Sequence, residues 1–239
     1  MFGNLDVDLT AKLELSTSLR YDRDHRKNIT ETPAAFIPAP LVGIAFPGQV
    51  RTHTWDDLQP KVTLRHKPTR DSTLYVGYSR GFRSGGFNQT GVGAAGIAGV
   101  NDLFDAETAD TYEGGAKAEC LAARVGANFS VYHTRANGSY VFVFDPNTST
   151  QNLGNLDRVD YTGAECEVRG RILDGFDGYV GVGVTNSDIK ESRRAASDVG
   201  NEAPLVSRYT ANVGLQYRHA LRSELSAFVR SDIQVIGPT

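Results

Sequence analysis

The sequence lacks the long apolar runs that a membrane-spanning helix needs. In its 239 residues no stretch approaches the roughly 20 consecutive apolar residues that cross a hydrocarbon core as a helix. A transmembrane helix is therefore excluded. A membrane β-barrel is not, because its strands alternate lipid-facing and lumen-facing residues. Such alternation keeps the mean hydropathy low, and here it is −0.33.

Cysteine is scarce as well. Cys120 and Cys166 are too few for a disulfide scaffold. Both lie beside alanine or valine at strand positions of one face. We expect them two strands apart, beyond the reach of a disulfide without backbone movement.

Positive charge is not in excess either, and chemistry-bearing clusters are missing. The net charge of −3 sets up no field for nucleic acid. The five histidines lie far apart and show no metal-ligand spacing. No hydrolase motif stands out. We therefore predict no catalytic residue, no cofactor and no metal ligand, and an enzyme is the least supported class.

What the sequence does have is alternation. Between residues 74 and 83, one set of side chains is Leu74, Val76, Tyr78, Arg80 and Phe82, and the intervening residues form a second, more polar set. A period of two residues indicates a strand with two different faces. Similar patterns predict further strands at residues 2–8, 12–26, 55–67, 107–120, 124–135, 152–167, 179–189, 204–217 and 224–235, about ten in all.

The connections between these strands alternate between long and short. Residues 28–53 are proline-rich and residues 84–105 are rich in glycine and alanine, so both read as long loops. We expect the second loop to be mobile and without regular structure. Alternation of long loops with short turns is typical of outer-membrane barrels, in which the long loops are extracellular.

Residues 74–88, LYVGYSRGFRSGGFN, resemble the hallmark segment in the barrel of TonB-dependent outer-membrane receptors. Residues 107–117 resemble the E-T-x3-E-x-G-x-K strand of the same family, and residues 2–24 resemble its hairpin ending in RYD. The resemblance runs over most of residues 1–235. It is densest at residues 72–88 and 107–117.

The resemblance implies an all-β fold, an antiparallel transmembrane β-barrel fragment of about ten strands. We expect a curved open sheet with long extracellular loops and short periplasmic turns. Residues 1–239 would be one partial barrel domain, with the plug domain and the final strands absent, since plugged transporters have ~22 strands. The start, MFGNLDVDLT, has no signal-peptide pattern, which fits an internal piece of a longer exported chain.

By the same resemblance, the whole receptor would import a scarce nutrient with energy supplied through TonB. An iron–siderophore complex is the commonest family ligand. The implied partners are outer-membrane lipid and lipopolysaccharide, the ferric siderophore, and the TonB complex through the missing plug, in the outer membrane of a Gram-negative bacterium. A passive porin-like or small self-contained barrel is the alternative, and a soluble β-sandwich or carbohydrate-binding domain is a third reading.

The candidate ligand-binding residues lie at the outer end of the hallmark strand and in the turn after it: Arg80, Arg83, Phe87 and Asn88. The two arginines could meet lipopolysaccharide phosphates, bind an anionic ligand, or pair with loop acids such as Asp102 and Asp105. A structural role is favoured for them. The loops at 28–53 and 84–105 are the candidate capture elements.

Two further sequence patterns are better explained by structural roles than by a chemical function. Gly77, Gly81, Gly85 and Gly86 suggest a strand bend and a tight loop rather than a phosphate-binding loop, because no helix follows them. Glu165 and Glu167 share one strand face. We read them as polar lumen residues and not as an acid–base pair.

Overall fold

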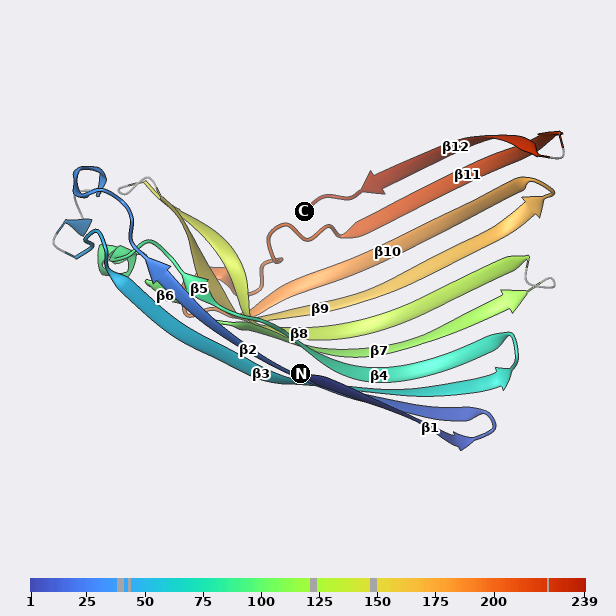
Figure 1. Ribbon diagram of the computed structural model, residues 1–239, viewed down its shortest axis with the longest axis horizontal. Helices are drawn as coiled ribbons and strands as arrows, with labels where there is room; N and C mark the ends of the chain where they lie inside the picture. Colours follow the sequence, from blue (N-terminus) through green and yellow to red (C-terminus); the bar gives the residue numbers. More distant parts are fainter. Residues whose placement is uncertain (38–40, 43, 121–123, 147–149, 223) are drawn as a thin grey trace.

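The computed structural model describes residues 1–37, 41–42, 44–120, 124–146, 150–222 and 224–239. Ten long strands form one antiparallel sheet (Figure 1). In spatial order they are β1 (Phe2–Thr10), β2 (Leu13–Ile29), β3 (Val50–Thr69), β4 (Ser72–Arg83), β7 (Glu107–Cys120), β8 (Val125–Asp145), β9 (Thr150–Leu173), β10 (Phe176–Glu191), β11 (Tyr209–Arg222) and β12 (Leu225–Ile236). The predicted all-β fold with about ten strands is confirmed.

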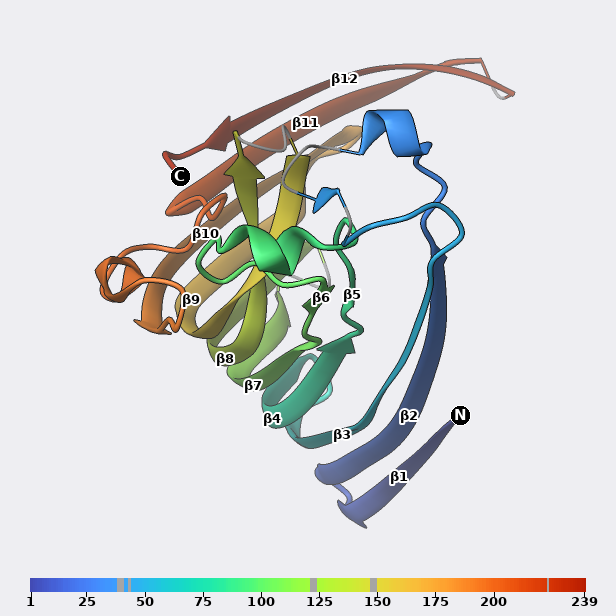
Figure 2. The same cartoon turned by 90° about the vertical axis from the view of Figure 1, so that its left-hand side faces the viewer.

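The sheet is curved and open, as predicted (Figures 1 and 2). In the described part of the chain, β1 pairs with β2 and β12 pairs with β11, and neither has a second partner. Both outer strands therefore present unpaired backbone groups that favour pairing with further strands. The arrangement is that of one sector of a barrel wall.

Short turns and long connections lie at opposite ends of the sheet. Two-residue turns join β1 to β2, β3 to β4 and β9 to β10. The turn predicted at residues 121–123 lies outside the described residues. At the other end, residues 30–49, 84–106 and 192–208 form long connections. We call the two ends the short-turn end and the loop end.

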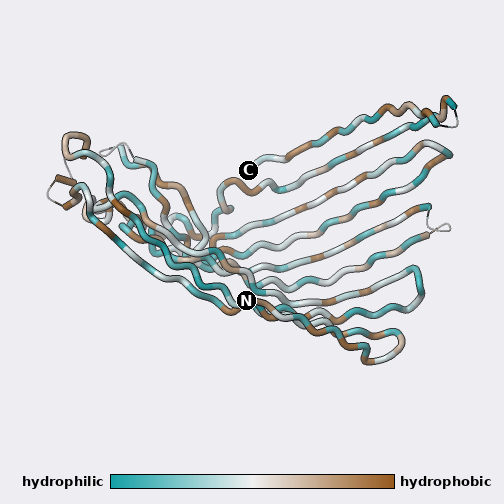
Figure 3. The backbone as a smooth tube through the Cα atoms, in the orientation of Figure 1, coloured by the Kyte–Doolittle hydropathy of each residue, from teal (hydrophilic) through white to brown (hydrophobic). Residues whose placement is uncertain are grey.

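The two faces of the sheet are chemically different, and hydrophobic and hydrophilic residues follow one another at short intervals along the strands of the short-turn half (Figure 3). One cross-strand row consists of Val76, Gly114, Val131, Ala164 and Val184, each directly opposite the next. The next row consists of Tyr75, Gly115, Ser130, Glu165 and Gly183 and points to the other face. We call the first face the outward face and the second the luminal face.

The outward face is apolar but is not a dry core. Val76 is 60% exposed, Val131 47% and Val184 49%. Buried hydrophobic residues gather at the loop end instead, where Leu156, Val159, Ile189 and Ala203 form a cluster. A β-sandwich would bury such residues between two sheets. The sandwich reading is therefore not supported.

Several elements are longer than predicted. Residues 141–144 and 152–167 belong to β8 and β9, which pair without a break from Val141 opposite Gly154 to Asp145 opposite Thr150. The simple alternation weakens there because loops pack against both strands and bury residues such as Asn152 and Leu156.

Pro60 marks the point at which β3 leaves β4. Its pairing with β2 opposite Leu19 continues without a shift, so no bulge forms there. The pairing of β3 with β4 ends one residue away, at Lys61 opposite Ser79. Proline has no N–H to donate. The separation leaves space between the loop-end parts of β3 and β4 for the next connection.

That connection, residues 84–106, was expected to lack regular structure, and this is wrong. It contains the two-stranded sheet of β5 (Gly86–Phe87) and β6 (Leu103–Phe104) and the 3-10 turn η3 (Val92–Ala95). Further 3-10 turns are η1 (Ala34–Phe36) and η4 (Ala196–Asp198). No described helix is long and apolar enough to cross a membrane.

The two cysteines lie as predicted. Cys120 is the last residue of β7 and Cys166 lies in β9, with β8 between them. Both thiols are free and exposed. The strand between them separates the two side chains too far for a disulfide.

Candidate ligand-binding site

The loop end carries a packed assembly over the concave side of the sheet. Residues 84–106, with β5, β6 and η3, lie between the β2–β3 hairpin and the β8–β9 hairpin (Figure 2). Leu41 in the first long connection and Val92 in the second are both fully buried. Thr30 Oγ1 in the first lies 2.7 Å from Thr90 Oγ1 in the second. The two candidate capture loops therefore pack together, and we call residues 30–49 and 84–106 the loop body.

Asn88 fastens this body to the sheet. Its Nδ2 donates to the carbonyl oxygens of Asn101 and Leu153, each at 2.7 Å. Its Oδ1 accepts a hydrogen bond from the N–H of Leu153 at 2.8 Å. The residue is 8% exposed. Asn88 thus acts as a buried bridge and has little surface left for direct contact with a ligand.

Arg51 provides a second fastening from β3. Its guanidinium donates to the carbonyl oxygens of Asn88 at 2.6 Å and Asp102 at 3.0 Å, and to Asn28 Oδ1 at 2.9 Å. It also lies 5.1 Å from the ring centroid of Phe87. Burial lowers the pKa of Arg51, and the nearby charge of Asp102 opposes that shift. The side chain remains charged because an arginine pKa starts far above neutrality.

Asp102 organises the turn that follows. Its two carboxylate oxygens accept hydrogen bonds from the N–H groups of Gly91 and Gly93, both at 2.8 Å. Gly91 has φ of +84°, a conformation that glycine adopts without steric cost. Asp102 therefore does not pair with Arg80 or Arg83, the partners considered from the sequence.

An aromatic and basic cluster surrounds Trp55 on the luminal face of β3. The ring centroids of Trp55 and His53 are 4.4 Å apart, and those of Trp55 and Phe87 are 5.9 Å apart in an edge-on arrangement. The guanidinium of Arg26 lies 5.9 Å from the Trp55 ring. A Cβ on Gly85 would lie 2.2 Å from the backbone oxygen of Phe104 and 2.7 Å from Trp55 Nε1. The close approach of these two groups therefore requires glycine at this position.

Arg83 is the most open of the predicted residues. Its side chain is 58% exposed and pairs with Glu107. The guanidinium lies 3.9 Å from the ring centroid of Tyr140, whose hydroxyl donates to Ser84 O at 2.6 Å. Burial raises the pKa of Tyr140. The geometry leaves part of the Arg83 charge facing solvent beside the loop body.

Arg80 is held inside the sheet. It donates to both carboxylate oxygens of Asp57, each at 3.0 Å, and forms an ion pair with Asp110 at 3.3 Å. The acids are 16% and 20% exposed. Neither Asp102 nor Asp105 is its partner. This arrangement supports the structural role that was favoured for Arg80.

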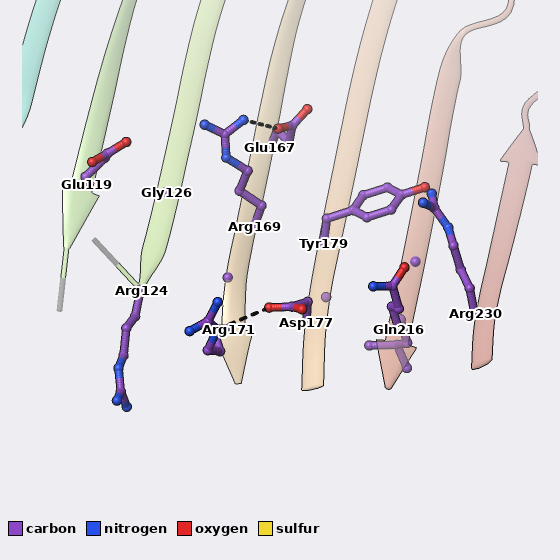
Figure 4. A pocket seen from close by; sticks show the side chains of 14 residues that line it. Glu119, Arg124, Gly126, Glu167, Arg169, Arg171, Asp177, Tyr179, Gln216 and Arg230 are labelled. Carbon is purple, nitrogen blue, oxygen red and sulfur yellow. Dashed lines mark ion pairs between the residues drawn. The ribbon is translucent and has the colours of Figure 1, made fainter. Parts of the chain in front are cut away.

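The luminal face also forms a hollow near the short-turn end, with a volume of about 710 Å³ (Figure 4). Within it Glu167 lies 3.9 Å from Arg169, and Arg171 lies 3.6 Å from Asp177. The wall is thus lined by charges of both signs, as expected for a wet lumen. The two glutamates predicted to face the lumen are Glu165 and Glu167, and they line such hollows.

No group of three or more metal-binding side chains lies together in the described residues. The loop end instead brings arginine side chains next to tryptophan and tyrosine rings, Arg26 beside Trp55 and Arg83 beside Tyr140. Such residues recognise ligands by charge, hydrogen bonds and stacking.

The family model for the TonB dependent receptor-like beta-barrel matches residues 1–234. The chain belongs to the TonB-dependent receptor family. The resemblance drawn from residues 74–88 and 107–117 is confirmed. Barrels of this family are outer-membrane proteins of Gram-negative bacteria, and the family consists of receptors and transporters rather than enzymes.

Solved structures share the fold. The ferric yersiniabactin uptake receptor FyuA from Yersinia pestis matches with a TM-score of 0.75 and 20% identity, over 99% of this chain and 33% of that one. The siderophore receptor PiuA from Acinetobacter baumannii matches with a TM-score of 0.66 and 19% identity, over 89% and 30%. The copper transporter OprC matches with a TM-score of 0.66 and 18% identity, over 90% and 32%. The chain spans about a third of the length of these three proteins.

The structure places two of the four predicted residues in the loop body and a third beside it. Phe87 and Asn88 contact Arg51 there, and Arg83 lies at its side against Tyr140. Arg80 lies apart, between β3 and β7. Sequence reasoning missed Arg51 and Tyr140. Trp55 could have been singled out from the sequence as a candidate site residue, because it is the single tryptophan.

Proposed function

We propose that this chain is part of the barrel wall of an outer-membrane receptor that captures a scarce nutrient and imports it with energy supplied through TonB. Residues 1–239 form one sector of the barrel domain, and the plug that couples to TonB belongs to another part of the longer protein. The match to the family model over residues 1–234 is the observation that carries the proposal.

The orientation follows from the connections. The loop end is extracellular and the short-turn end periplasmic, because outer-membrane barrels have long outer loops and short inner turns. The loop body then lies at the extracellular mouth of the lumen. A ligand arriving from outside can reach Arg83, whose side chain is 58% exposed and lies against the Tyr140 ring.

We infer that the ligand is an anionic metal chelate, most simply a ferric siderophore. One of the similar structures is named a ferric yersiniabactin uptake receptor and another a siderophore receptor, whereas a third is named a copper transporter. Arg83 supplies an exposed cation beside an aromatic ring, and both favour a flat anionic chelate. Phe87, Asn88 and Arg80 support Arg83 by fixing the loop body and the strand.

The test is uptake by the whole receptor in a Gram-negative host grown under iron limitation. Cells receive radiolabelled ferric siderophores of the catecholate, hydroxamate and carboxylate types, with a copper chelate as a fourth cargo. Accumulation of one cargo that stops when TonB is deleted is the expected result. Accumulation that persists without TonB would instead indicate the passive porin-like alternative.

A matched pair of variants ties uptake to the loop body. Arg83→Ala removes the exposed cation, and Lys190→Ala removes an exposed cation of β10 that is held by Asp188. Uptake should fall in the first variant and stay unchanged in the second. Equal uptake in both would show that Arg83 takes no part in capture.

A further inference from the structure

On the luminal face, Tyr132 of β8 lies across β9 and reaches β10. It is directly opposite Gly163 of β9, and Gly163 is in turn directly opposite Thr185 of β10. A Cβ on Gly163 would lie 2.5 Å from Tyr132 Cζ, so the ring occupies space that glycine leaves free. Beyond the glycine, the hydroxyl oxygens of Tyr132 and Thr185 are hydrogen-bonded at 2.7 Å. One side chain thus joins three neighbouring strands.

The same arrangement recurs two strands further along the sheet. Tyr179 of β10 is directly opposite Gly214 of β11, and Gly214 is directly opposite Asp232 of β12. A Cβ on Gly214 would lie 2.7 Å from Tyr179 Cζ. The Tyr179 hydroxyl donates to Asp232 Oδ1 at 2.9 Å. Figure 4 shows the ring of Tyr179 lying along the wall from β10 towards Arg230 of β12.

Tyr75 of β4 makes a related contact. It is directly opposite Gly115 of β7, and a Cβ on Gly115 would lie 2.7 Å from Tyr75 Cζ. The Tyr75 hydroxyl donates to Glu113 of β7, and this contact joins β4 to β7. A luminal tyrosine ring therefore covers a glycine of the next strand at three places in the wall.

We call the two arrangements that reach a third strand the clasps. The first consists of Tyr132, Gly163 and Thr185, and the second of Tyr179, Gly214 and Asp232. Because β10 belongs to both, the clasps join β8 to β12 without a break.

The clasps specify the register of the strands where the alternation of faces cannot. A slip by two residues would leave every side chain on its own face, so the two-residue period does not exclude it. Such a slip between β8 and β9 would place Tyr132 opposite Tyr161 or Glu165 instead of Gly163. Either side chain would occupy the space in which the ring lies. The ring can therefore lie flat only in the observed register.

The flat rings also leave the lumen open. Tyr179 and Gly214 both line the luminal hollow of about 710 Å³, and the ring lies along its wall (Figure 4). A hydrogen bond between the first and the third strand on the concave side favours a curved wall (Figure 2). The strands are thus joined without filling the space between them.

We propose that the two clasps fix the register and the curvature of the wall from β8 to β12 without narrowing the lumen, so that the wall keeps its shape while a cargo passes. The passage of a cargo rests on the proposed function. The fixing of register and curvature does not, because it depends only on contacts within the wall.

The experiment is a double-mutant cycle on the second clasp, read by hydrogen exchange of the whole receptor in lipid vesicles. Tyr179→Ala, Gly214→Ala and the variant with both changes are compared with the original protein. The three atoms nearest to a Cβ on Gly214 belong to the side chains of Tyr179 and Asp232. Removal of the ring should therefore make alanine tolerable at Gly214.

Each single change should accelerate exchange in β10–β12 by about tenfold, because either one breaks the clasp. Exchange in the variant with both changes should be within about twofold of that in Tyr179→Ala, since nothing remains for the second change to break. An acceleration of about 100-fold, the product of two independent effects, would overturn the proposal, and so would unchanged exchange in the single variants.

A milder variant tests the first clasp. Tyr132→Phe keeps the ring and loses the bond to Thr185, so exchange in β8–β10 should be about fivefold faster. The control is Tyr112→Phe, since Tyr112 is an exposed tyrosine of β7 whose hydroxyl makes no hydrogen bond in the part of the chain that the structure describes. It should change exchange by less than twofold. Equal acceleration in the two variants would contradict the clasp.

The hairpin of β2 and β3 serves as an internal control, because neither clasp reaches it. Its exchange should stay the same in every variant. Acceleration there as large as in β8–β12 would mean general loosening of the protein and would overturn the proposal. Cargo uptake is measured separately on the same variants, so that failure of the clasps and failure of transport are distinguishable.

Discussion

The side chain of Asn88 and the backbone of Leu153 form a two-way hydrogen-bonded bridge across 65 residues of sequence. Asn88 Nδ2 donates to Leu153 O at 2.7 Å, and Asn88 Oδ1 accepts from Leu153 N at 2.8 Å. The pair mimics one step of a β-ladder. It joins the connection after the hallmark strand to β9 and so fixes the loop body over the lumen.

Replacing Asn88 by alanine should detach the loop body locally. The Leu153 N–H would lose its partner in a buried place, at a cost of about 2 kcal/mol. Hydrogen exchange at Leu153 and through residues 84–106 should then accelerate by roughly 30-fold. Gln89→Ala is the control, because its side chain makes no hydrogen bond in the described structure. Equal exchange in both variants would contradict the bridging role.

The hallmark glycines should differ in their tolerance of a methyl group. A Cβ at Gly85 would lie 2.2 Å from Phe104 O and 2.7 Å from Trp55 Nε1, whereas at Gly81 the nearest atom is 3.9 Å away. Gly85→Ala should therefore displace Trp55 and shift its fluorescence emission to longer wavelength. Gly81→Ala should leave the emission unchanged.

Trp55 is the single tryptophan of the sequence, so its emission reports this position in the chain. The measurement is made in detergent and compared with far-ultraviolet circular dichroism, which should stay the same in both variants. An unchanged emission spectrum in Gly85→Ala would mean that the close approach of Gly85 to the indole is absent.

The strands with strong alternation could be predicted from the sequence, because the two-residue period arises within each strand. β7 begins at Glu107 and ends at Cys120 as predicted, since each side chain there faces either lipid or lumen. The loop-end parts of β8 and β9 could not be predicted in this way. Their residues pack against connections distant in sequence, and burial on both faces removes the two-residue period.

The candidate site could be predicted only in part, for a related reason. The sequence singled out Arg80, Arg83, Phe87 and Asn88 but not their partners. Arg80 pairs with Asp57, which the β2–β3 hairpin brings back beside β4, rather than with the loop acids that follow it. No pattern within one strand encodes such a pairing, because it depends on where β3 separates from β4.

Alanine substitution should lower stability more at Arg80 than at Arg83. Arg80→Ala leaves Asp57 and Asp110 without their shared partner at 16% and 20% exposure, so we expect stability to fall by about 1–3 kcal/mol. Arg83 is 58% exposed, and Arg83→Ala should cost less than about 1 kcal/mol. Arg83→Ala should instead lower the affinity for the imported chelate. Thermal unfolding measures the stability of both variants, and a binding titration measures the affinity.

Arg80→Lys provides a control for the first of these effects. It keeps one positive charge but loses the two-pronged contact with Asp57, so its stability should lie between those of the original protein and Arg80→Ala. The assignment fails if Arg83→Ala proves the more destabilising change or if Arg80→Ala lowers chelate affinity without lowering stability.

The assignment of faces predicts a difference between two adjacent residues of β8. Val131 belongs to the apolar outward row and Ser130 to the luminal row. Lysine at an outward position near the bilayer midplane costs about 2–4 kcal/mol, whereas a wet lumen accommodates it. Ser130→Lys would also lie near Glu165, its direct cross-strand neighbour in β9. Val131→Lys should therefore lower the free energy of unfolding in lipid bilayers, and Ser130→Lys should not. Equal destabilisation, or a larger loss in Ser130→Lys, would mean that the outward and luminal faces are interchanged.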